Sequence, residues 1–152
     1  MRPIIDFIRK VRRLVWRERL LLLEASLWLA VAGLAIGVLP FRHVGRLAGT
    51  SLWTRELTRQ TRLVTVQQIR WAVAVCARRV PWRAMCFQQG LAAQLMLRWR
   101  GVPSVLYYGV TPDRQSGLAA HVWVRDGDLD VVGGEIASRF AVLATFPQQE
   151  AC

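Results

Sequence analysis

The stretch Pro81-Trp82-Arg83-Ala84-Met85-Cys86, followed by a helical pattern over about residues 84–100, decides the fold that this sequence predicts. A proline and a bulky tryptophan precede Cys86 instead of a smooth helical continuation, so the cysteine falls in the first turn of the helix. The positive end of the helix macrodipole favours a thiolate there over a thiol. The free N–H groups of the first turn would also lie beside the sulfur, where they can stabilise an oxyanion. The sequence thus predicts a nucleophilic cysteine at a loop-to-helix junction.

A histidine on a predicted strand supplies the expected partner. His121 opens the strand-like run 121–125, which follows a β run over 104–110 and precedes a second short run over 129–132. Taken alone, a cysteine in an apolar helix is usually a core residue, and a histidine in a strand is usually structural. A helix-borne Cys86 facing a strand-borne His121, however, is the arrangement of papain-like and transglutaminase-like enzymes. We therefore expect the two residues to form a catalytic pair.

The third catalytic residue should accept a hydrogen bond from the other ring nitrogen of the histidine. If the hairpin turns at Asp126-Gly127, Trp123 pairs with Asp130, and Asp130 then lies on the same face as His121 and diagonal to it. A slip of one residue in the register would move Asp130 to the opposite face. We take Asp130 as the candidate orienting carboxylate, with Glu135 as the substitute.

Trp82 and Trp123 are candidates for the walls of a substrate-binding cleft, although either could equally be a core residue. The chain has three cysteines and two histidines, with no Cys-x-x-Cys pair, so the sequence predicts no metal site and gives no sign of a cofactor. Cys76 is expected to be a small buried hydrophobe, and Cys152 is the last residue. A disulfide framework is not expected, which favours a reducing cytoplasm.

Charge is distributed unevenly along the chain. Residues 1–101 carry eighteen basic and four acidic side chains, whereas residues 102–152 carry three basic and six acidic ones. The basic part suggests an anionic membrane surface or an acidic partner, or arginines that simply solvate apolar helices. No nucleic-acid-binding motif accompanies it, so no nucleic-acid partner is predicted.

The pattern predicts an α+β fold. An apolar run over Leu20–Leu39, broken by Glu24, is expected to be a helix that packs on the domain or lies on a membrane surface, because Glu24 and the basic flanks count against a spanning helix. A further helix is expected over Leu63–Arg79. We divide the chain into an N-terminal helical region, 1–62, and a core, 63–152, in which the Cys86 helix packs on a small antiparallel sheet; residues 137–147 suggest a short helix and a tail.

Several stretches resemble the leader-peptidase (B protein) family of lasso-peptide biosynthesis, in its standalone form, a branch of the transglutaminase-like cysteine peptidases. The matching stretches are Pro81–Cys86 with Gln89 and residues 91–94, Leu97–Ser104, Gly109-Val110, Ala120–Val124, and Val131–Glu135 with Phe140, residues 143–144 and Phe146-Pro147. Residues 18–25 and 39–42 are similar to the helical region of the family. Family members often carry an aspartate on the strand after the histidine, within a short Val-Val-Asn-Asp-like stretch. This chain has Val131-Val132-Gly133-Gly134 there, so the resemblance supplies no third catalytic residue.

The resemblance implies cytoplasmic removal of a leader from a ribosomally made precursor peptide. An ATP-dependent lasso cyclase would then join the freed amine to an acidic side chain. Because the chain has no room for a separate peptide-binding domain, we expect a small leader-binding protein, a RiPP recognition element, to present the leader as an added strand. The alternatives are an acyltransferase on the same Cys–His scaffold and a membrane-associated scaffold without chemistry, and the expected location is cytoplasmic or peripheral to the inner membrane.

Overall fold

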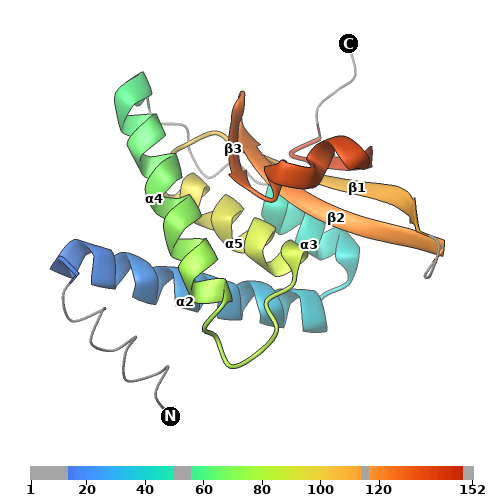
Figure 1. Cartoon of the computed structure of the whole chain (residues 1–152), viewed down its shortest axis with the longest axis horizontal. Helices are drawn as coiled ribbons and strands as arrows, with labels where there is room; N and C mark the ends of the chain where they lie inside the picture. The colour runs from blue at the N-terminus through green and yellow to red at the C-terminus, as the bar shows by residue number, and fades with distance from the viewer. Residues whose placement is uncertain (1–13, 50–55, 114–116, 149–152) are drawn as a thin grey trace.

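The computed structural model describes residues 14–49, 56–113 and 117–148, and it has a helical part followed by an antiparallel sheet (Figure 1). The helices are α2 (Trp16–Val38), α3 (Phe41–Gly49), α4 (Arg59–Ala77) and α5 (Cys86–Trp99). The strands are β1 (Val105–Asp113), β2 (Gly117–Asp126), β3 (Leu129–Val132) and β4 (Ala141–Phe146), and a 3-10 helix, η1 (Gly134–Arg139), joins β3 to β4. The strand order is β3-β2-β1-β4, and every neighbouring pair is antiparallel. The predicted α+β class is confirmed, while the tail expected near residue 147 contains the strand β4.

Helix α5 is the centre of the molecule. It packs against α2 and α4 on one side and against β2 on the other (Figure 1). One hydrophobic core therefore runs from Leu29 of α2 through Ile69 of α4 and Leu91 of α5 to Val122 of β2, all at most 1% exposed. The core is continuous across residue 62, where we place the boundary between the two regions.

Helix α2 is apolar on both of its faces. Its inner face carries Leu22, Ala25, Leu29 and Ala32, which follow each other at helical spacing and are buried against α4 and α5. By length and composition α2 could also cross a membrane. Its inner face belongs to the core of the domain, which is the packing that the sequence analysis offered as one of its two arrangements.

The hairpin of β2 and β3 has a register that differs from the expected one. Asp126 pairs with Leu129 around a two-residue loop, and Asp130 lies opposite Arg125 instead of Trp123. The register prediction is thus wrong by two residues, because the chain turns at Gly127-Asp128, where Gly127 has a φ of 58°. Because the register shifts by two residues, Asp130 stays on the same face of the sheet as His121 but lies opposite a residue farther along β2.

Asp126 ties the sheet to α4. The sequence analysis placed it in the turn, but it ends β2, is 2% exposed, and forms an ion pair with Arg62, in which Nε donates to Oδ2 at 3.1 Å. A buried carboxylate needs such a partner, because an uncompensated buried charge is strongly destabilising.

We expect Arg62→Ala to lower the free energy of unfolding by about 2 kcal/mol, because it leaves the Asp126 carboxylate buried and unpaired. The matched control is Arg59→Ala, an exposed arginine of the first turn of the same helix, which should change stability by no more than about 0.5 kcal/mol. Urea unfolding followed by circular dichroism measures both. Equal small losses in the two variants would mean that the buried pair does not hold β2 to α4.

Candidate functional site

Cys86 is the first residue of α5, as predicted, and two glutamine side chains fix the junction that precedes it. The backbone N–H of Met85 donates to Oε1 of Gln88 at 3.0 Å, and Nε2 of Gln89 donates to the carbonyl of Ala84 at 2.8 Å. These bonds hold the loop in the extended conformation that starts the helix. The Cys86 thiol is partly exposed, beside helical N–H groups that have no intrahelical acceptor.

Gly90, one turn after Cys86, sets how closely α5 approaches the sheet. A Cβ at this position would lie 2.7 Å from Cγ1 of Val122, the neighbour of His121. Only a residue without a side chain allows this contact. Because residues i and i+4 share a helix face, the contact at Gly90 also brings the Cys86 end of that face to the strand that carries His121.

Cys86 and His121 line the same cavity, which has a volume of about 280 Å³. The remaining lining comes from α4, α5, β2, the end of β3, and η1 with the residue before it: Arg70, Ala74, Gln89, Val122, Val131, Val132, Gly133 and Glu135. The pairing of β2 with β3 ends at the pair Val124–Val132. Strand β3 therefore does not pair with the edge of β2 at His121. The predicted pair is therefore brought to one opening in the surface.

The ring of His121 is held by a backbone carbonyl. Its Nε2 lies 2.8 Å from the carbonyl oxygen of Gly133. A carbonyl can only accept a hydrogen bond, so Nε2 carries the proton and, in the neutral ring, Nδ1 carries the free lone pair. Phe140 and Trp123 pack against the ring, with centroids 5.0 and 6.1 Å from its own. The hydrogen bond thus specifies the tautomer of His121, and the two aromatic rings help to fix the orientation of its imidazole.

Gly133 has a conformation that requires glycine. Its φ is 74°, and a Cβ there would lie 2.6 Å from the carbonyl oxygen of Val122 and 3.1 Å from Nε2 of His121. Sequence reasoning noted the Gly133-Gly134 pair as a departure from the aspartate of similar proteins but assigned it no role. The pair itself was the available signal, since consecutive glycines often mark a backbone that approaches another group closely.

Asp130 pairs with Arg125 and not with His121. Its Oδ1 accepts a hydrogen bond from Nε of Arg125 at 2.6 Å. The carboxylate also covers Gly134, where an added Cβ would overlap it. Asp130 thus packs against the turn that presents the Gly133 carbonyl. Glu135, the substitute candidate, lines the cavity and pairs with Arg70 at 3.1 Å.

Neither tryptophan candidate lines the Cys86–His121 cavity. Trp123 is 3% exposed and stacks on Tyr107, with ring centroids 5.4 Å apart. Trp82 lines a second hollow, together with Leu23 and Cys76. Trp123 therefore supports His121 from within the core, whereas Trp82 faces a different surface.

The other cysteines differ from Cys86. Cys76 is buried, as predicted, and its thiol donates to the carbonyl of Leu22 at 3.3 Å. Burial raises the pKa of the Cys76 thiol and so suppresses its thiolate. Cys152 lies outside the described residues. Within the described ranges, no cluster of three or more His, Cys, Asp or Glu residues could hold a metal.

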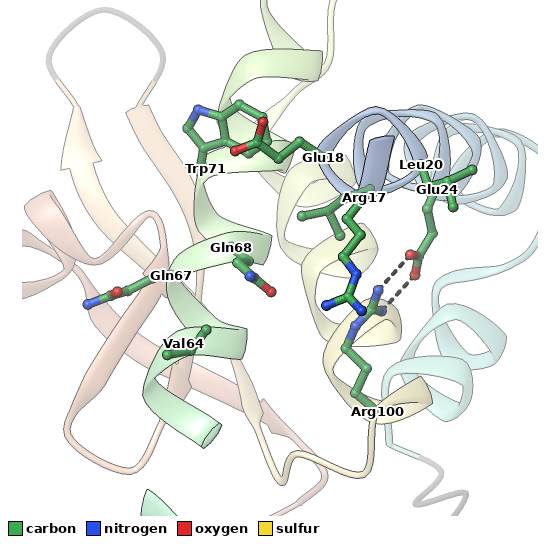
Figure 2. Close-up of a pocket in the computed structure, with 10 residues that line it drawn as sticks. Arg17, Glu18, Leu20, Glu24, Val64, Gln67, Gln68, Trp71 and Arg100 are labelled. Atoms are coloured by element: carbon green, nitrogen blue, oxygen red, sulfur yellow. Dashed lines mark hydrogen bonds and ion pairs between the residues drawn. The ribbon is translucent and has the colours of Figure 1, made fainter. Parts of the chain in front are cut away.

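A larger hollow, of about 750 Å³, lies between α2 and α4 (Figure 2). Its polar lining includes Arg17 and the ion pair of Glu24 with Arg100, whose two hydrogen bonds measure 2.6 and 2.7 Å. No cysteine, serine or histidine is among its lining residues, so it offers no nucleophile. Cys86 and His121 line the smaller cavity instead.

The model of the transglutaminase-like superfamily matches residues 20–145. This match covers the helices as well as the sheet, and the chain belongs to the transglutaminase-like superfamily. Neither the curated proteins nor the solved structures contain a match to the chain. The family model is specific neither for one reaction nor for one substrate.

We expect Gly133→Ala to displace the carbonyl from His121, and therefore to abolish the single Nε2–H tautomer of the neutral ring. Nitrogen chemical shifts of the ring measure this, with His43→Gln used to assign the signals. The matched control is Gly127→Ala, which has a similar positive φ of 58° but no atom within 4 Å of the added Cβ. Both variants should lose about 1 kcal/mol of stability, but only Gly133→Ala should change the tautomer and slow catalysis, by roughly a hundredfold.

The variant Asp130→Asn tests whether the Gly133 carbonyl or the Asp130 carboxylate orients the ring of His121. If the Gly133 carbonyl suffices, this variant retains catalysis within about tenfold of the wild type and resembles Asp128→Asn. A loss near four orders of magnitude, the size of the equivalent change in serine proteases, would restore Asp130 to the role that the sequence suggested.

Proposed function

We propose that this chain is a cysteine peptidase that removes the leader from a ribosomally made lasso-peptide precursor before macrolactam cyclisation. The observation that carries the proposal is that Cys86, at the start of α5, and His121, on β2, line one cavity. Membership of the transglutaminase-like superfamily supports cysteine-based acyl chemistry. The precursor as substrate is supported by the similarity of the stretches around Cys86 and His121 to lasso leader peptidases.

The proposed reaction begins when Nδ1 of His121 takes the proton of the Cys86 thiol. The sulfur attacks the carbonyl carbon of the leader–core peptide bond, and N–H groups at the start of α5 stabilise the oxyanion. The C–N bond then breaks, and the imidazolium returns its proton to the departing amine of the core peptide. Water, deprotonated by His121, hydrolyses the thioester, which releases the leader as a carboxylate and regenerates the thiol.

The Gly133 carbonyl contributes to this reaction through orientation. It keeps the Nε2 proton in place, so that Nδ1 is the nitrogen that exchanges protons with Cys86 and the amine. The carbonyl dipole also stabilises the imidazolium that forms after the thiol has lost its proton. A neutral acceptor stabilises that cation less than a carboxylate does, which would lower the rate without changing the steps.

The proposed partners are the precursor peptide, a separate leader-binding protein and the lasso cyclase that uses the freed amine. The four-stranded sheet is covered by α5 on one face, and residues 133–140 lie over His121 on the other. The cavity of about 280 Å³ has room for only a few side chains next to the scissile bond. Recognition of a long leader would therefore fall to the second protein.

We expect Cys86→Ala and His121→Ala each to abolish leader cleavage while the circular dichroism spectrum stays unchanged. Cys76→Ala and Cys152→Ala should still cleave. The assay is mass spectrometry of a purified lasso-peptide precursor, with and without a separate leader-binding protein, at low micromolar concentration. Cleavage should require that protein, and an added amine should not be incorporated into the product.

Three outcomes would contradict parts of this proposal. Full activity of Cys86→Ala would remove the mechanism and favour a scaffold without chemistry. Transfer of the acyl group to the added amine would favour an acyltransferase. Equal cleavage rates with and without the leader-binding protein would show that the chain binds its own leader.

A further inference from the structure

We propose that the outer face of α2 docks on an anionic membrane surface. We define this face by seven large apolar residues that are exposed to solvent: Trp16, Leu20, Leu23, Leu27, Val31, Leu34 and Val38. They recur every three or four residues along the whole helix and lie opposite the buried Leu22, Ala25, Leu29 and Ala32. The inference is independent of the chemistry proposed for Cys86.

The outer face is exposed to an extent that is unusual for a helix of a soluble domain. Leu23, Leu27 and Leu34 are 67%, 63% and 68% exposed, and Val38 is 76% exposed. The inner face already meets α4 and α5, so the described part of the chain leaves the outer face uncovered. A continuous apolar patch of this length, about 33 Å for 22 residues, marks a surface that binds something.

Arginines frame the N-terminal half of this face. At 100° per residue, exposed Arg17 and Arg19 lie on opposite flanks of the apolar stripe. Arg17 and Arg100 line the same hollow (Figure 2), and Arg100 is already paired with Glu24. The only other acidic residue of α2, Glu18, accepts a hydrogen bond from the N–H of Val15. The charge balance along the stripe is therefore positive and fits anionic head groups.

The loop between α4 and α5 extends the same surface. It runs past α2 at the bottom of the view in Figure 1 and exposes Arg78, Arg79 and Arg83. Between this loop and α2 lies an almost entirely apolar hollow of about 480 Å³, lined by Leu23 and Trp82 with Arg19 and Arg79 at its side. Arginine beside apolar and aromatic groups suits the boundary between phosphate head groups and acyl chains.

The spacing of the stripe is not that of the seam of a left-handed coiled coil. Its steps average about 3.7 residues, whereas the seam of a left-handed coiled coil repeats every 3.5 residues. The stripe thus runs straight along α2, as it does in a helix that lies flat on a bilayer. A spanning orientation conflicts with the inner face, which is packed in the core of the domain.

The test is co-sedimentation of the full chain with vesicles of phosphatidylcholine alone or with phosphatidylglycerol added. The wild type should bind the anionic vesicles at least about tenfold better, and high salt or carbonate should release it. Leu27→Glu/Leu34→Glu should weaken this binding at least about tenfold. The matched control is Val142→Glu/Leu143→Glu, which changes two similarly exposed apolar residues of β4 and should bind like the wild type.

If the circular dichroism spectra of both double variants match that of the wild type, a loss of binding cannot be attributed to unfolding. Failure of the wild type to bind either vesicle, or equal binding by Leu27→Glu/Leu34→Glu, would overturn the proposal. So would retention on the membrane after carbonate treatment, which indicates a spanning helix. A lipid-free dimer that Leu27→Glu/Leu34→Glu converts to monomer in sedimentation velocity would assign the outer face to a second copy of the chain instead.

Discussion

The contact between α5 and β2 at Gly90 is the constraint on which the site depends. A Cβ at Gly90 would lie within 2.7 Å of Val122, so the helix reaches the sheet only because this residue has no side chain. Cys86, the proposed nucleophile, lies one turn before Gly90, and both Val122 and its neighbour His121 line the same cavity as Cys86. Two regular elements, and not flexible loops, hold the two residues of the proposed pair. Such rigid support is what a catalytic pair requires, since small displacements of reacting groups are costly.

Much of the fold was predictable because its signals are local. The Pro81–Cys86 lead-in correctly placed the start of α5, and the helical pattern correctly placed α4 to within four residues of its first residue. The burial of Cys76 also followed from helical spacing. The strand β4 was not predicted, because its pairing partner β1 is more than thirty residues away in sequence.

The identity of the group that holds His121 was beyond sequence reasoning for a different reason. A loop of two residues and the bulge between Val124 and Arg125 together set the β2–β3 register, and neither leaves an unambiguous pattern in the residues. The same shift that pairs Asp130 with Arg125 positions the Gly133 carbonyl at Nε2 of His121. Backbone groups have no sequence signature of their own, so a carbonyl that holds a histidine ring shows only indirectly, through a glycine such as Gly133 whose positive φ the turn requires.

The central claim is that His121 activates Cys86 as a nucleophile, and alkylation of the cysteines by iodoacetamide at pH 6 tests it most directly. Mass spectrometry resolves the three sites, and buried Cys76, whose thiol has a raised pKa, is the internal reference. The account predicts that Cys86 reacts fastest, and that His121→Ala slows its alkylation at least about tenfold while the rates at Cys76 and Cys152 stay unchanged. Equal alkylation of all three cysteines, or a Cys86 rate that does not depend on His121, would contradict it.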